Sequence, residues 1–119
     1  MKENAIEQKS YAFAVRIVNL CRYLQDKKKE FVLSKQILKS GTSICANVSE
    51  AECGISDKDF LAKMYIAYKE SAETKYWLNL LKDTGYLTKQ EFTSLYKDCM
   101  ELVRMLSSIT KTIDRKLKV

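Results

Sequence analysis

Apolar residues recur at alternating steps of three and four along the second half of this chain, and that spacing restricts the fold more than any other feature. It extends through residues 60–81 and again through residues 92–113. A period of 3.5 places an apolar seam on one side of an α-helix and favours near-parallel helix packing at about 20°. The second half is therefore predicted to form two long helices that pack side by side. The seam positions are Phe60, Met64, Ala67, Ser71, Thr74, Leu78 and Leu81, followed by Phe92, Leu95, Cys99, Leu102, Leu106, Ile109 and Ile113.

Start and stop signals divide the chain into four predicted helices. The first covers residues 4–28 and the second covers residues 30–53, with Gly54 as its stop. The third lies between Ser56 and Gly85, and Thr88 with Glu91 forms a capping box at the start of the fourth. The chain has no proline, and connections of about two to four residues make neighbouring helices antiparallel. We predict one all-α domain over residues 1–119, an up-down-up-down antiparallel four-helix bundle.

Four polar residues interrupt the apolar surface of the second predicted helix. Ser40, Ser43, Asn47 and Glu50 are spaced by three, four and three, so they share one helix face. Covered polar groups need hydrogen-bond partners. Two interpretations are open: a ligand site, or hydrogen bonds to the third helix that fix its register, of which the second is favoured. Gly41 indicates a close approach of another helix, because glycine costs a helix about 1 kcal/mol relative to alanine.

The third predicted helix carries candidate partners for this polar stripe. Glu70, Glu73 and Trp77 are spaced by three and four and share a face, and Lys35 or Lys39 is placed to neutralise either glutamate. Aromatic residues on this helix exceed what one monomeric bundle needs to bury, which indicates a subunit interface. These residues are Tyr65, Tyr68, Tyr76 and Trp77.

The composition argues against catalysis and against a metal or cofactor site. The chain has no histidine, which removes imidazole general bases and the Glu-x-x-His pairs of di-iron bundles. It has no complete phosphate-binding loop and no nucleophile elbow. The four cysteines form no C-x-x-C pair, so we expect reduced thiols and neither zinc ligands nor disulfides. They are Cys21, Cys45, Cys53 and Cys99.

The net charge of +6 favours an acidic partner, either nucleic acid or an anionic surface. The alternative is that the lysines only solubilise the helices. In the predicted topology the cations gather at the two ends of the bundle, and repetition in an oligomer would multiply the phosphate contacts. The first basic cluster contains Lys27, Lys28, Lys29, Lys82 and Lys89. The second basic cluster contains Lys2, Lys9, Lys58, Lys111, Arg115, Lys116 and Lys118.

Residues 38–51 read LKSGTSICANVSEA and resemble the signature of the four-helix-bundle proteins encoded in intervening sequences of bacterial 23S rRNA genes. That signature has a basic residue followed by Ser-x-x-Ser-Ile-x-x-Asn-Ile-x-Glu. Here Val48 replaces the common isoleucine, and Cys45 stands where glycine or alanine is frequent. Residues 69–78 resemble the third-helix pattern of the same family, so the resemblance covers nearly the whole chain.

The resemblance implies a short four-helix bundle that assembles as a ring-like homopentamer. A related branch, the accessory proteins of diversity-generating retroelements, consists of basic pentamers associated with nucleic acid and a reverse transcriptase. By resemblance the polar stripe matches the family motif, although no role for the motif follows from that match.

Charge and resemblance together predict a non-enzymatic oligomer that binds RNA or DNA through lysine-rich surfaces, by shape and charge and not by reading bases. The alternative is an interaction module that docks a partner protein and has no direct nucleic-acid role. No segment has the roughly 18 to 20 apolar residues needed to cross a bilayer, and the N-terminus has no signal-peptide pattern. We therefore expect a soluble cytoplasmic protein without a membrane partner.

Overall fold

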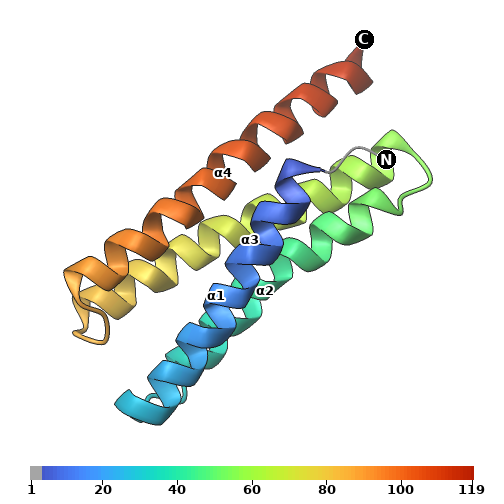
Figure 1. Cartoon of the computed structure of the whole chain (residues 1–119). Helices are drawn as coiled ribbons and strands as arrows, with labels where there is room; N and C mark the ends of the chain where they lie inside the picture. Colours follow the sequence, from blue (N-terminus) through green and yellow to red (C-terminus); the bar gives the residue numbers. More distant parts are fainter. Residues whose placement is uncertain (1–3) are drawn as a thin grey trace.

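A computed structural model describes residues 4–119, and this part of the chain consists of four α-helices without a β-strand. The helices are α1 (Ala5–Lys28), α2 (Leu33–Glu52), α3 (Asp57–Asp83) and α4 (Lys89–Lys118), as Figure 1 shows. The all-α, four-helix prediction is confirmed. Lys2, which the sequence assigns to the second basic cluster, lies outside the described residues.

Side-chain caps fix most of the helix starts where the sequence places them. The Asn4 side chain accepts a hydrogen bond from the backbone N–H of Ile6, and the Ser56 side chain accepts one from Asp59. At α4 the predicted capping box is present. Thr88 Oγ1 accepts from the Glu91 N–H (3.1 Å), and Glu91 Oε1 accepts from the Thr88 N–H (2.8 Å).

The start of α2 differs from the prediction, because Glu30 caps this helix and does not belong to it. The carboxylate accepts hydrogen bonds from the backbone N–H groups of Val32 (3.1 Å), Leu33 (2.9 Å) and Ser34 (2.7 Å). Burial raises the pKa of this carboxyl, but these N–H donors and the Ser34 side chain outweigh it and hold the pKa below its usual value. The Glu30 carboxylate thereby satisfies N–H groups in the first turn of α2 that have no partner inside the helix.

Three of the four helix pairs pack closely, and the pair α1–α4 does not. Contacts join α1 to α2, α2 to α3 and α3 to α4 along their lengths, whereas α1 and α4 touch far less. Lys9 pairs with Glu101 (3.0 Å) and Arg16 pairs with Asp98 (2.7 Å), in opposite order along the two helices, so α1 and α4 run antiparallel. The described chain measures 50 × 24 × 22 Å, and the end of α4 projects past the other helices (Figure 1).

The predicted seams form the core. In α3 every seam position from Met64 to Leu81 is buried, and in α4 the buried positions are Leu95, Cys99, Leu102 and Leu106. The seam residues nearest the helix ends, Phe60, Phe92, Ile109 and Ile113, are half-buried because fewer helices surround them. The partner helices contribute Phe13, Ile17, Leu24, Ile37, Ile44 and Val48, each at most 2% exposed.

Candidate functional site

The polar stripe of α2 has one buried member, and this residue makes the predicted link to the third helix. The hydroxyl oxygens of Ser40 and Thr74 are 2.9 Å apart, and both residues are fully buried. The Thr74 hydroxyl also lies 2.8 Å from the carbonyl oxygen of Glu70, to which it donates. Ser40 therefore bonds across the α2–α3 interface, and its partner is Thr74 and not the side chain of Glu70, Glu73 or Trp77.

The other members of the stripe, two of them half-buried and one exposed, make different contacts. Ser43 donates to the carbonyl oxygen of Lys39 (2.6 Å), and Asn47 donates to the carbonyl oxygen of Ser43 (2.8 Å). For these two residues the predicted cross-bundle hydrogen bond is wrong, because a carbonyl four residues earlier in the same helix is within reach. Glu50 does cross to α3, where its carboxylate pairs with Lys63 (2.8 Å).

The predicted face of Glu70, Glu73 and Trp77 lies on α3 in the turns that flank Thr74, the partner of Ser40. The Trp77 indole donates to Glu73 Oε2 (3.0 Å). Burial, followed by the negative charge of Glu73, raises the pKa of Glu70, while the positive charges of Lys39 and Lys69 oppose that rise. Among the described residues neither glutamate forms a salt bridge with Lys35 or Lys39, so Lys39 acts on Glu70 only through its field.

Gly41 marks the close helix approach that the sequence predicts. A Cβ atom at this position would lie 2.8 Å from both Cγ1 and Cγ2 of Ile17, on α1. Carbon atoms in contact are normally about 3.5–4.0 Å apart, so a glycine is required where α1 and α2 touch.

The first basic cluster gathers at one end of the molecule. Lys27 and Lys28 occupy the last turn of α1, Lys82 the last turn of α3, and Lys89 the first position of α4. Lys82 Nζ lies 4.2 Å from the ring centroid of Phe92 and 3.8 Å from a carboxylate oxygen of the adjacent Asp83. Within the described chain the other members, Lys29 included, form no salt bridge, so most of the charge of this cluster is free.

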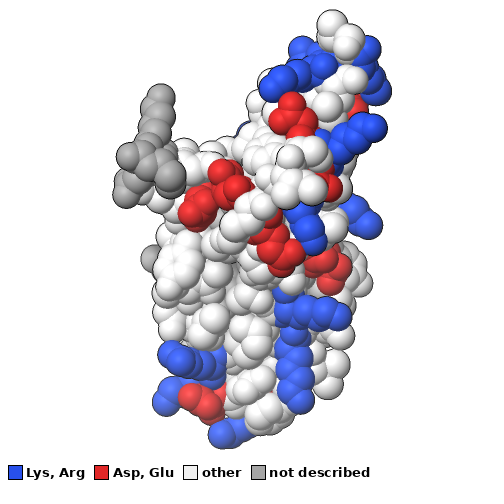
Figure 2. Space-filling view, turned by 90° about the vertical axis from the view of Figure 1, so that its right-hand side faces the viewer, with Lys and Arg blue, Asp and Glu red and all other residues white. Residues whose placement is uncertain are grey.

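The second basic cluster carries less net charge than a count of its lysines implies. Lys9 pairs with Glu101, Lys116 with Asp57 (3.3 Å) and Lys118 with Asp114 (3.1 Å). Figure 2 shows cations at the projecting tip of α4 and at the opposite extremity, with carboxylates concentrated between them. The cations of this cluster that have no carboxylate partner among the described residues are Lys58, Lys111 and Arg115.

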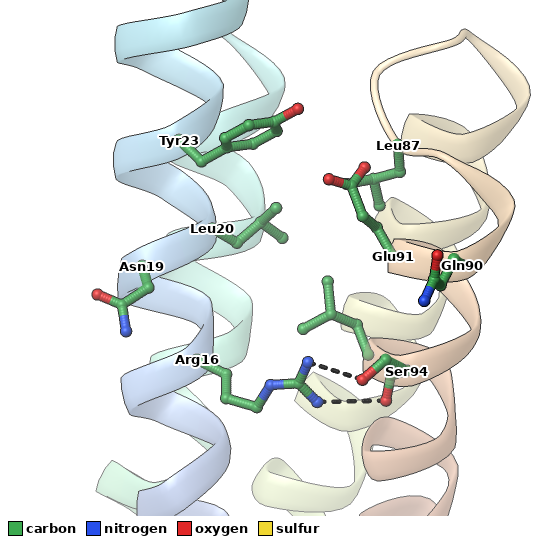
Figure 3. A pocket seen from close by; sticks show the side chains of 9 residues that line it. Arg16, Asn19, Leu20, Tyr23, Leu87, Gln90, Glu91 and Ser94 are labelled. Atoms are coloured by element: carbon green, nitrogen blue, oxygen red, sulfur yellow. Dashed lines mark hydrogen bonds between the residues drawn. The ribbon is translucent and has the colours of Figure 1, made fainter.

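A groove of about 470 Å³ lies between α1 and α4, and nothing in the sequence pattern predicted it (Figure 3). Leu20, Leu87 and Leu95 form its apolar lining. Arg16 crosses one end and donates to the Ser94 hydroxyl (2.9 Å) and carbonyl oxygen (3.2 Å). The helix spacing predicts which faces are apolar, but it does not predict that α1 and α4 stay apart.

Residues 4–119 hold few groups suited to metal binding or to thiol chemistry. They contain no group of three or more His, Cys, Asp or Glu side chains able to hold a metal ion. All four cysteines are free, and burial raises the pKa of the Cys99 thiol to about 12, against the opposing charge of Lys75. Cys99 donates weakly to the carbonyl oxygen of Ser71 (3.5 Å), so it packs as a small apolar group. No helix in this part of the chain is long and apolar enough to span a membrane.

The fold and surfaces define an all-α protein of four helices with a basic end cluster, a buried hydrogen bond between α2 and α3, and an open groove. The chain belongs to the 23S rRNA-intervening sequence protein family, whose model matches residues 2–108. The predicted family resemblance is confirmed.

A solved structure from Bacteroides thetaiotaomicron VPI-5482, described as a protein with unknown function from the S23 ribosomal protein family, is similar to this chain. The two are 51% identical, with a TM-score of 0.89, over 90% of this chain and 99% of that one. No curated protein matches the chain.

Proposed function

We propose that this protein is a non-enzymatic oligomer that binds RNA or DNA through its lysine-rich surfaces, without a cofactor. The observation that carries the proposal is the first basic cluster, where the ends of α1 and α3 and the start of α4 bring five lysines together. Four of them, Lys27, Lys28, Lys29 and Lys89, are exposed. Phosphate contacts from such residues add to affinity regardless of base sequence, because each one releases counterions.

The proposed assembly is a ring-like homopentamer of up-down-up-down bundles. Its support is the resemblance to the family and the apolar surface that one copy leaves uncovered. Tyr11 and Tyr76 are 65% and 56% exposed, and Val15 and Ile66 also face solvent. Light scattering tests this assembly, with an expected mass five times that of the 13.8 kDa chain. A monomer at micromolar concentration would contradict it.

The test of the function is a binding titration of the assembled protein with a labelled RNA hairpin and a DNA duplex of matched length, across a salt series. We expect submicromolar binding at low salt and a steep loss of affinity as salt rises. The ratio of the two affinities identifies the preferred nucleic acid. Binding that stays unchanged up to about 0.5 M salt would rule out the electrostatic mechanism. No binding at low salt would leave the lysines as solvated surface.

A second candidate function is the docking of a partner protein, which the groove between α1 and α4 favours. Its lining of Leu20, Leu87 and Leu95 beside polar groups suits an apolar side chain from a partner. Purification from the native cell after nuclease treatment separates the two functions. A stoichiometric protein that stays bound supports docking, whereas loss of all partners with the nucleic acid supports the first proposal.

We place this activity in the cytoplasm. The chain keeps four free cysteines, of which Cys21, Cys45 and Cys99 are buried, and a reducing compartment preserves such thiols. Fractionation of the native cell tests this placement.

A further inference from the structure

The outer side of α4 carries a row of exposed cations. Lys97, Arg104, Lys111 and Arg115 are separated by seven, seven and four residues, so each lies within about 40° of the same direction around the helix. All four are exposed, and none forms a salt bridge with a carboxylate of residues 4–119. At 1.5 Å per residue the row is about 27 Å long. Lys97 and Arg104 belong to neither basic cluster. We call these four residues the α4 cation row.

The carboxylates of α4 all have partners outside this row. Asp98 and Glu101 pair with Arg16 and Lys9 on α1, and Glu91 caps the helix start. Asp114 pairs with Lys118. The acidic residues that would screen the row therefore already have partners, and its positive potential reaches solvent.

A hollow of about 400 Å³ opens beside the row, between α3 and α4. Three members of the row contribute to its lining together with the hydroxyl groups of two serines and a tyrosine. Guanidinium, ammonium and hydroxyl donors around one concave site are the groups that bind phosphate oxygens. The polar lining residues are Tyr68, Arg104, Ser107, Ser108, Lys111 and Arg115.

We propose that the α4 cation row is a second surface, besides the first basic cluster, on which the sugar-phosphate backbone of nucleic acid lies, with one phosphate group in the hollow beside Arg104 and Lys111. This inference rests on the proposed function and specifies where the nucleic acid contacts each subunit. Four contacts per subunit give a salt slope of about −3.6 for duplex DNA and about −2.8 for a single strand. The end of α4 projects past the other helices (Figure 1), so a long ligand has access to its last turns.

The test compares two variants that lose the same charge. Lys97→Gln/Arg104→Gln removes half of the row, and the control Arg22→Gln/Lys35→Gln removes one exposed arginine and one exposed lysine that lie outside the row and outside both basic clusters. Each is titrated against the RNA hairpin and the DNA duplex across salt, and its mass is measured by light scattering. We expect the α4 variant to lower affinity for duplex DNA about 30-fold near 0.15 M salt and to reduce the slope by about 1.8, since each lost contact removes about 0.9. The control variant should change the affinity and the salt slope much less.

Three results would overturn the inference. Equal losses in both variants would mean that net charge alone matters, and the proposed nucleic-acid function would stand. A changed oligomer mass in the α4 variant would place the row in a subunit interface. Absence of binding by the unmodified protein would refute the proposed function itself. Arg104→Lys, which keeps the charge, should retain the wild-type slope.

Discussion

Replacing Gly41 with alanine tests the closest contact between α1 and α2. The new Cβ would lie 2.8 Å from Cγ1 and Cγ2 of Ile17 and 3.2 Å from its Cβ. Contacts between carbon atoms are favourable at about 3.5–4.0 Å, so the gap is about 0.7 Å too small. Ile17 is fully buried, and its branched Cβ leaves few rotamers. The side chain therefore has no room to rotate away, and the two helices have to move apart.

Two opposing terms set the size of the effect. Alanine stabilises a helix interior by about 1 kcal/mol relative to glycine. An extra carbon in a well-packed core costs about 1–3 kcal/mol, and the stiffness of Ile17 places this site in the upper part of that range. We expect Gly41→Ala to lower the free energy of unfolding by about 1–2 kcal/mol. The melting temperature of a domain of this size should fall by about 4–8 °C.

A double-mutant cycle in urea, followed by far-UV circular dichroism, checks this reasoning. Ile17→Ala removes both Cγ atoms, so Gly41→Ala in that background should stabilise by about 1 kcal/mol. The sign of the Gly41→Ala effect should thus reverse between the two backgrounds. If Gly41→Ala stabilises the otherwise unmodified protein, or costs the same in both backgrounds, the contact with Ile17 does not explain the glycine.

Three further predictions concern buried polar groups. Glu30→Gln should lower the free energy of unfolding by about 1–3 kcal/mol at pH 7, because the amide offers fewer acceptors to the N–H groups of α2. Since folding lowers the pKa of Glu30, the carboxylate stabilises the fold at pH values above its unfolded-state pKa, and this stabilisation is lost as the pH falls through its folded-state pKa. Urea unfolding at two pH values measures both effects. Ser40→Ala should cost about 0.5–1.5 kcal/mol and couple to Thr74→Val, and additive costs would exclude their hydrogen bond. With a pKa of about 12, Cys99 should react with a thiol reagent at pH 8 only after unfolding, whereas exposed Cys53 reacts at once; equal rates would contradict its burial.

Apolar spacing, together with the capping residues and the glycine stops, was enough to predict the helices and most of the core. The three-four spacing from Met64 to Leu81 predicts burial well because every seam position lies on the same side of the helix. Even the polar residues Ser71 and Thr74 are buried there. Gly41 was informative for a similar reason. A helix interior tolerates glycine only when packing compensates for its propensity, and Ile17 provides that packing.

The sequence did not predict features that depend on which of several available hydrogen-bond partners a polar side chain binds. Glu30 reads as a helical residue, yet its carboxylate folds onto the first N–H groups of α2. Asn47 shares a helix face with Ser40, but it is only half-buried and donates to the carbonyl oxygen of Ser43 in its own helix. Periodicity places Ser40 and Asn47 on one helix face, but it does not predict how deeply each of them is buried.

The open seam between α1 and α4 and the α4 cation row have a common origin. In a fully packed seam Asp98 and Glu101 would lose contact with water, and their charges would then be costly unless they were paired. Here α1 reaches α4 through Arg16 and Lys9, which draw the α4 carboxylates toward α1. The cations of the α4 row, on the solvent-facing side of the helix, form no salt bridge with a carboxylate of residues 4–119. These exposed ion pairs contribute only about 0–1 kcal/mol each to stability, so their larger effect is on how charge is distributed over α4.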